Sequence, residues 1–331
     1  MFNILDYVAK PKCLIINQDG FDLDVRANLE LFYTLTGYRV STVDTWSSCD
    51  LLVIQRVNCV KNFKSFGAHR MHIYDYSKTN PVEALVQSNL ESLIDVITLD
   101  KTLIEQIGIY DHVFPIFSYH PVVPKLWMLP VVARKFNFVH VGHCKYKSES
   151  DVFQKRLIDL VKFNEMMHCF GNDWTRIQVG ELRFHAPVSL HECQRIYRGA
   201  SFTLGVMYDF QRGRTLSGRM WQGPLNGCTV ITEALPVGFS PPGVFETAED
   251  MTHVALLLGV KSRVVRSSLA IKSLSFWEEE VVKLADKLDL IFKNPSQLKL
   301  VIFYFRKIYW RHFRSAAKKL LLFVRGGIKG K

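Results

Sequence analysis

The chain has 331 residues, of which 48% are hydrophobic, and its formal net charge is +11 at pH 7. This length and apolar content suffice for two domains with a core each and exclude a disordered chain. The seven cysteines are scattered, without Cys-x-x-Cys or zinc-spaced Cys/His sets, so we expect buried thiols in a reducing compartment and no metal site.

The positive charge lies almost entirely at the C-terminus. Residues 299–331 hold ten Lys/Arg and no acidic residue, which leaves a net charge of +1 for the first 298 residues. A nearly neutral body argues against nucleic-acid binding as a property of the whole chain. The N-terminus lacks the pattern of a secretory signal, and no stretch reaches the roughly 18 apolar residues of a membrane span. We therefore expect a cytoplasmic protein.

Strand and helix patterns alternate through the first part of the chain. Residues 12–17 (KCLIIN) predict a buried strand, and residues 24–36 predict a helix that Gly37 ends. Further strand candidates are 38–43, 50–55, 70–76, 95–100 and 112–117. Such alternation indicates βαβ units and a mostly parallel sheet. The proline-marked stretch from Pro115 to Pro130 has little periodicity and predicts a linker.

A second α/β series begins at residue 137. The predicted strands are 137–143, 167–171, 201–206 and 228–232, and the predicted helices are 151–167, 191–198, the segment from Arg219 and 276–293. Residues 243–259 predict a strand or loop and then a helix. The fold class is α/β, with two Rossmann-like domains facing a cleft and a C-terminal amphipathic basic helix. The predicted boundaries are 1–120, a linker at 121–136, 137–295, and the basic helix at 296–331.

An arginine-bearing loop and helix follow the predicted strand 201–206. This order places Arg212, Arg214 and Arg219 outside the carboxyl ends of parallel strands, where open sheets bind ligands. Guanidinium groups suit a diphosphate because their planar fork matches two phosphate oxygens at once. Arg219 and Gln222 share one helix face. The simpler alternative is that Arg219 is a surface arginine in an interdomain salt bridge and Gln222 is only polar.

The end of that helix carries a stop signal. Gly227 is expected to end the helix and to let it pack close to the following strand. Together with GNDW (171–174) and IYRGA (196–200), the segment RMWQGPLNGCTVIT (219–232) resembles the GT-B glycosyltransferases. The similarity is to the family 4-like and spore-maturation glycosyltransferase-like proteins in particular. It covers about residues 137–250 well and the N-terminal half in outline.

This resemblance implies roles for individual residues. Gln222 would touch the ribose of a nucleotide, and the three arginines would neutralise its diphosphate. Further donor contacts would come from Gly142, His143, and the backbone of Pro187 and Val188. A strand-ending glycine and a plain connecting loop are the alternatives for these last positions.

The sequence departs from the family at two positions. The usual glutamate is Gln222, and a position that is acidic in many related enzymes is Thr215. A glutamine amide can still hydrogen-bond a ribose hydroxyl, but it cannot fill a role that requires charge.

Acidic residues follow predicted strands in the first domain. Asp19 and Asp75 are the candidate catalytic residues, because direct displacement needs a base within hydrogen-bond reach of the acceptor hydroxyl. Each could instead form an Asx-turn or a helix cap. The resemblance implies a retaining enzyme, in which departing diphosphate can itself assist the incoming hydroxyl.

The C-terminal tail is amphipathic and basic. Apolar residues at helical spacing with Lys/Arg between them are typical of a helix lying on anionic lipid. The basic residues assigned to the membrane are Arg306, Lys307, Arg311, Arg314, Lys318 and Lys319. Packing against the first domain and nucleic-acid binding are the alternatives.

These observations predict a glycosyltransferase on the inner face of a membrane. It would move a sugar from a nucleotide-diphosphate donor, bound by residues 137–295, to a glycan or lipid-linked glycan held by residues 1–120, as in surface polysaccharide or lipopolysaccharide assembly. The expected partners are the nucleotide sugar, the acceptor and the anionic membrane, without nucleic acid, metal or other cofactor. A catalytically silent scaffold that binds a glycan or nucleotide, and a sugar-nucleotide epimerase of the same fold, are the alternatives.

Overall fold

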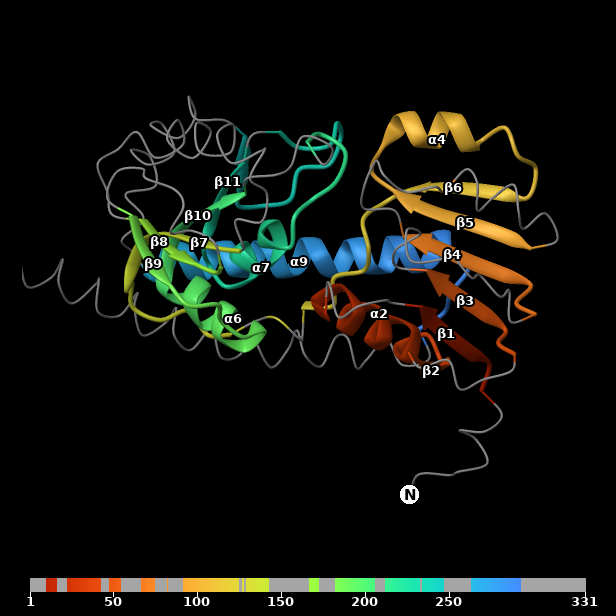
Figure 1. Ribbon diagram of the computed structural model, residues 1–331, viewed down its shortest axis with the longest axis horizontal. Helices are drawn as coiled ribbons and strands as arrows, with labels where there is room; N and C mark the ends of the chain where they lie inside the picture. The colour runs from red at the N-terminus through yellow and green to blue at the C-terminus, as the bar shows by residue number, and fades with distance from the viewer. Residues whose placement is uncertain are drawn as a thin grey trace, which may run out of the picture.

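A computed structural model shows two α/β domains with a long helix running along both (Figure 1). The residues that it describes are 10–16, 23–42, 48–54, 67–74, 82, 92–124, 127, 129–142, 167–172, 182–205, 212–232, 234–246 and 263–292. Within them, no helix is both long and apolar enough to cross a membrane.

The first domain is built on a six-stranded parallel sheet with the order β2-β1-β3-β4-β5-β6. The strands are β1 (Lys12–Ile16), β2 (Arg39–Ser41), β3 (Leu51–Ile54), β4 (Arg70–Tyr74), β5 (Leu93–Thr98) and β6 (Val113–Phe117). Continuous apolar runs such as LLVI in β3 are fully buried, as expected of parallel strands covered on both faces. All six strands were predicted. Helix α2 (Leu23–Leu35) was predicted as well, whereas α4 (Lys101–Ile107) was not.

The second domain has another parallel six-stranded sheet, with the order β12-β11-β10-β7-β8-β9. Its elements are β7 (Phe136–Val141), β8 (Met167–Phe170), β9 (Leu182–His185), α6 (Leu190–Gly199), β10 (Ala200–Gly205), α7 (Arg219–Leu225), β11 (Thr229–Thr232) and β12 (Val244–Glu246). The strand order reverses between β1 and β3 in the first sheet and between β7 and β10 in the second. Open α/β sheets bind ligands outside the carboxyl ends of the strands at such points.

Some predicted elements differ from the structure. The helix predicted for 151–167 lies outside the described residues except for Met167, which begins β8. Strand β9 was missed because its sequence, LRFH, lacks a long β-branched run. The helix predicted for 276–293 is α9 (Arg263–Lys287), which begins 13 residues earlier. The basic helix predicted for 296–331 lies outside the described residues.

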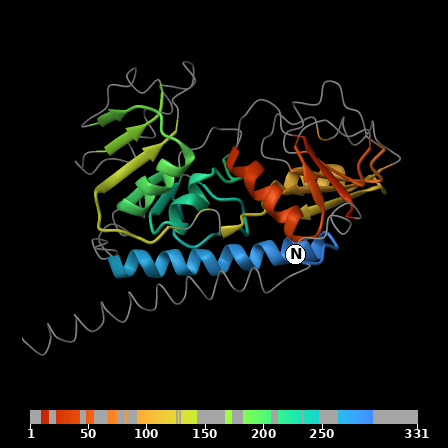
Figure 2. The same ribbon diagram turned by 90° about the horizontal axis from the view of Figure 1, so that it is seen from below.

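Helix α9 contributes to the cores of both domains. Ala270, Leu274 and Trp277 pack in a cluster with residues of α7, whereas Val281 and Leu284 pack in a cluster with α2 and the first sheet. Figure 2 shows α9 lying beneath both domains. The helix therefore ties the two sheets together rather than belonging to the second domain alone.

Gly227 ends α7 as predicted but packs differently from the prediction. Its φ of +76° is in the left-handed region, and a Cβ there would lie 2.6 Å from the carbonyl oxygen of Arg266 in α9. The close approach of α7 to β11 is made at Gly223, where a Cβ would lie 3.0 Å from Val230. The fully buried Arg266 donates to the carbonyls of Gly227, Val132 and Arg198 and so fixes this end of α9.

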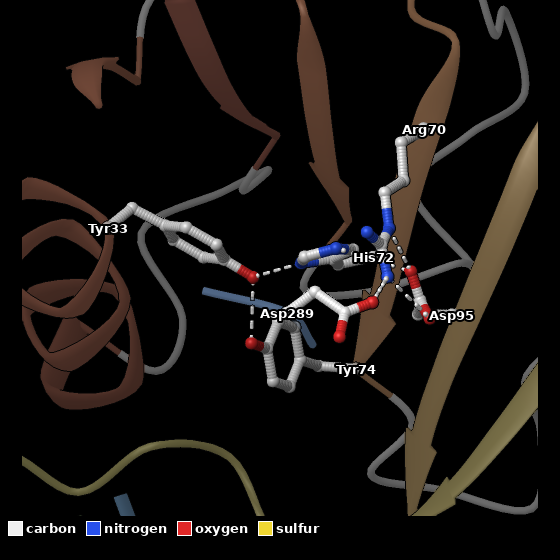
Figure 3. Close-up of polar contacts among 6 residues, drawn as sticks. All are labelled: Tyr33, Arg70, His72, Tyr74, Asp95 and Asp289. Atoms are coloured by element: carbon white, nitrogen blue, oxygen red, sulfur yellow. Dashed lines mark hydrogen bonds and ion pairs between the residues drawn. The ribbon is translucent and has the colours of Figure 1, made fainter. Parts of the chain in front are cut away.

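A chain of polar side chains is buried in the first domain (Figure 3). His72 on β4 lies opposite Asp95 on β5 in the sheet register, with Nε2 3.3 Å from the Asp95 carboxylate. Arg70 Nε donates to the same carboxylate at 2.7 Å. On the other side of His72, the Tyr33 hydroxyl lies 2.7 Å from Nδ1 and 2.8 Å from the Tyr74 hydroxyl.

These contacts determine the protonation of the network. Burial lowers the pKa of His72, so the imidazole is neutral. Its Nε2 proton then faces Asp95, and Nδ1 accepts a hydrogen bond from the Tyr33 hydroxyl. Burial alone would raise the pKa of Asp95, but the hydrogen bonds from His72 and Arg70 lower it. The carboxylate is therefore ionised and satisfied inside the domain.

Candidate functional site

The candidate site lies where the two domains meet, beyond the carboxyl ends of β1, β7 and β10. Helix α2 follows β1, Gly142 directly follows β7, and the Arg212–Gly218 loop and α7 come after β10. Polar contacts between these segments bring residues of the two switch points together. The described residues contain no group of three or more His, Cys, Asp or Glu able to hold a metal ion.

Arg219 is the first residue of α7 and lies against the end of β7. Its Nη1 donates to the carbonyl oxygen of Val141 at 3.0 Å. A Cβ on Gly142 would come within 2.8 Å of the same nitrogen, so glycine is what lets the guanidinium lie here. Burial and then the nearby Arg219 charge lower the pKa of His140 on β7, so this imidazole is neutral. The structure thus places a cation, backed by a neutral ring, at the switch point of the second sheet.

The other two predicted arginines are placed differently. Arg214 Nη1 forms an ion pair with the Asp100 carboxylate of the first domain at 3.3 Å. Asp100 also caps α4 by accepting from the backbone N–H groups of Thr102 and Leu103. Arg212 is exposed. The structure therefore holds Arg214 and Arg219 by separate partners, one on each domain.

Gln222 is buried and faces the first domain. Its Nε2 donates to Asp24 Oδ2 at 2.7 Å, and its Oε1 lies 3.6 Å from Cys193 Sγ. Thr215, the other position at which the sequence departs from the family, is also buried, with 5% of its surface exposed. Both side chains are therefore buried rather than on an open surface.

Pro187 and Val188 lie between β9 and α6. Pro187 is exposed, while Val188 is half-buried and packs against the cluster that contains Tyr197. The next residue, Ser189, forms a capping box with Glu192 that fixes the start of α6. The loop is thus rigidly connected to α6, whose residue Cys193 contacts Gln222.

Several predicted site residues lie outside the described residues. These are Asp19, Asp75, His143, and the six basic tail residues Arg306, Lys307, Arg311, Arg314, Lys318 and Lys319. Conversely, sequence reasoning missed Asp24 and Asp100, two carboxylates that contact the second domain from the described part of the first. The available signal was that each stands at the start of a helix that follows a parallel strand.

Two parallel Rossmann-like domains that meet at their switch points define the GT-B class of fold. Three solved structures share this architecture with the chain. The DNA-modifying enzyme β-glucosyltransferase matches with a TM-score of 0.57 at 10% identity, covering 84% of this chain and 100% of that one. T4 phage BGT in complex with its UDP-glucose substrate matches with a TM-score of 0.55 at 11% identity and the same coverage.

An α-glucosyltransferase in complex with UDP-glucose and DNA containing an abasic site has a TM-score of 0.55 at 10% identity, covering 81% of this chain and 95% of that one. No family model and no curated protein matches the sequence. At these identities the similarity establishes the fold and leaves the activity to the residues of the site.

Proposed function

We propose that the protein is a glycosyltransferase that uses a nucleotide-diphosphate sugar as donor. The observation that carries this proposal is the position of Arg219, held by the end of β7 above Gly142 at the switch point of the second sheet. A guanidinium there can pair with a diphosphate in the place where open α/β sheets bind nucleotides. The three similar structures, all of which were described with UDP-glucose, support a uridine nucleotide as the first donor to test.

The arginines would stabilise the departing diphosphate. As the bond to the anomeric carbon breaks, negative charge grows on the leaving oxygen, and positioned guanidinium groups favour that change. Arg214 would exchange its ion pair with Asp100 for the donor phosphate. Arg212, His143, Pro187 and Val188 remain proposed donor contacts.

In direct displacement, which inverts the anomeric carbon, a carboxylate of the first domain would receive the proton of the acceptor hydroxyl. Asp19 and Asp75 remain the proposed catalytic residues. Asp100 joins them because it faces the donor domain through Arg214 and becomes available when that arginine binds the donor. We propose independence of metal and retention of the anomeric configuration, in which the departing diphosphate assists the incoming hydroxyl in place of a carboxylate; an inverted product would assign that role to the carboxylates. NMR of the product and assay in EDTA test these two points.

The experiment that tests the proposed activity is a thermal-shift screen with UDP, GDP, CDP and TDP sugars, followed by donor hydrolysis. We expect one nucleotide to stabilise the protein, and Arg219→Ala to abolish both stabilisation and hydrolysis. Arg195→Ala, which removes an exposed arginine of α6, is the matched control and should behave like the wild type. Absence of stabilisation at millimolar concentration would reject the donor site and leave the scaffold alternative.

For the acceptor, we propose a glycan or lipid-linked glycan at the inner face of a membrane, supported by the basic amphipathic tail. Flotation with anionic vesicles tests this. Deletion of residues 299–331 should abolish binding, and unchanged binding would reject the tail as the membrane contact.

DNA is a second candidate acceptor, favoured by the DNA in one similar structure and the DNA-modifying activity of another. Transfer of labelled sugar to DNA rather than to a lipid extract would select it.

A further inference from the structure

A buried amide of the second domain is hydrogen-bonded to a carboxylate of the first. Gln222 Nε2 and Asp24 Oδ2 are 2.7 Å apart although the residues are separated by 198 positions in the sequence. Gln222 is 6% exposed, and Asp24 is half-buried in the first turn of α2. This bond joins the helix that follows the switch strand β1 to the helix that carries Arg219.

The orientation of the amide follows from its second partner. Burial raises the pKa of the Cys193 thiol to about 12, so the thiol is protonated at neutral pH and can donate to Gln222 Oε1. The NH₂ group of Gln222 is then the end that faces Asp24. The amide thus presents a donor to the Asp24 carboxylate.

Gly218 and Asn28 allow and support this close approach of Asp24 to Gln222. A Cβ on Gly218, the residue before α7, would lie 2.9 Å from Asp24 Oδ2, so a larger residue would push the carboxylate away. One turn along α2, Asn28 donates to the carbonyl of Asp24 at 3.0 Å. Asn28 Oδ1 in turn accepts from the backbone N–H of Val123 and from Trp127 Nε1. Asp24 is therefore held in place from both domains.

These contacts explain why position 222 is an amide. A glutamate there would bring two carboxylates to about the 2.7 Å separation that the amide and carboxylate have now, and like charges at that distance cannot both stay ionised. The carboxylate that contacts position 222 is supplied by the first domain.

We propose that Asp24 is a donor-binding residue that accepts a hydroxyl of the bound nucleotide sugar, with Gln222 as its positioning residue. This inference rests on the proposed glycosyltransferase function. A ribose hydroxyl and a hydroxyl of the transferred sugar can both donate a hydrogen bond to a carboxylate. The experiment distinguishes them by comparing deoxy analogues of UDP with UDP-glucose.

The test measures dissociation constants of UDP, 2′-deoxy-UDP, 3′-deoxy-UDP and UDP-glucose by calorimetry for the wild type and Asp24→Asn. If the partner is a ribose hydroxyl, one deoxy analogue binds the wild type about ten- to hundredfold more weakly than UDP, as for a hydrogen bond to a charged group. Asp24→Asn then erases that difference. If it is a sugar hydroxyl, Asp24→Asn weakens UDP-glucose by a similar factor and leaves UDP unchanged.

Two results would overturn the proposal. One is an equal loss of affinity for all four ligands in Asp24→Asn, which indicates a purely structural contact, and the other is no change for any of them. Asp111→Asn, an exposed aspartate of the same domain, is the matched control. Failure of the wild type to bind any of the four would instead count against the proposed use of a uridine donor.

A charge swap tests the hydrogen bond itself. At pH 8, Gln222→Glu should lower the melting temperature, and adding Asp24→Asn should restore it, because the amide and the carboxylate then exchange places. If Gln222→Glu is as stable as the wild type, the two side chains are not in contact in solution and Gln222 does not position Asp24.

Discussion

Replacing Asp95 with alanine is expected to loosen the first domain without affecting the second. The substitution removes the acceptor of Arg70 and the partner of His72, both on β4, inside the network of Figure 3. Breaking a buried pair by removing one partner costs about 3–5 kcal/mol. Asp95 is 2% exposed, but the Arg70 side chain is 33% exposed and its charge can turn toward water. We therefore expect the lower end, about 3 kcal/mol.

Hydrogen exchange followed by mass spectrometry measures the stability of each domain separately, which a single unfolding transition of a two-domain protein does not. About 3 kcal/mol corresponds to roughly hundredfold faster exchange of amides in β3, β4 and β5. Strands β10 and β11 of the second domain should exchange as in the wild type, and Asp111→Ala should change neither domain. Tyr33→Phe, which removes one hydroxyl from the network, should speed exchange about tenfold.

An increase of less than about threefold in Asp95→Ala would refute the reasoning, because it would mean that the carboxylate contributes less than about 1 kcal/mol to the folded domain. A uniform increase in exchange across both domains would refute the expectation that the effect is confined to the first domain.

The same network predicts the direction of the pH dependence. The pKa values of His72 and Asp95 are both lowered in the folded protein, so the unfolded chain binds more protons on acidification. The contribution of His72 to the free energy of unfolding is fully present above about pH 6.5 and is lost as the pH falls below that value. The contribution of Asp95 is lost below about pH 4. Urea midpoints should therefore fall from pH 7.5 to pH 5, and a midpoint that rises over this range would contradict the assignment.

Three further predictions concern single positions. Gly227→Ala should lower the free energy of unfolding by about 1–3 kcal/mol more than Gly238→Ala, since both have positive φ but only the first would meet a carbonyl oxygen, at 2.6 Å; equal losses in urea unfolding would contradict this. Gly142→Ala should weaken nucleotide-diphosphate binding about tenfold in calorimetry, because its methyl would displace a guanidinium nitrogen 2.8 Å away; unchanged binding would contradict this. Asp100→Asn keeps the cap of α4 but removes the carboxylate that competes for Arg214, so a nucleotide diphosphate should bind about two- to fivefold more tightly. Weaker binding would argue against the proposal that Arg214 leaves Asp100 to bind the donor phosphate.

Most of the fold followed from local patterns in the sequence. Buried parallel strands show as short apolar runs, and glycine at 37 and 227 marked helix ends that the structure confirms with positive φ values. Strand β9 and helix α4 escaped because neither has a clear hydrophobic period. The start of α9 was missed for a related reason, since its first turns (RVVRSSLA) lack an apolar stripe and bury an arginine, Arg266.

The candidate site was less visible from the sequence. Periodicity could place Arg219 beside the end of β7, because both lie at carboxyl ends within one sheet. It could not show that Arg214 would pair with Asp100, because nothing local relates residues 114 positions apart. Contacts between domains depend on how the two sheets are oriented, and that orientation is set by the packing of α9 and of the segment around Trp127.

Gln222 shows how a contact that the sequence does not reveal can change a functional argument. Considered alone, glutamine in place of glutamate suggests a lost charge and a silent protein. In the structure the charge is present, carried by Asp24 across the interface, and an amide at position 222 is the group that can hold it there. A carboxylate restored at position 222 would repel the one already present, so the substitution that looks corrective in the sequence would be harmful in the folded protein. The relevant unit is therefore the pair of positions, which joins one amide and one carboxylate across the interface.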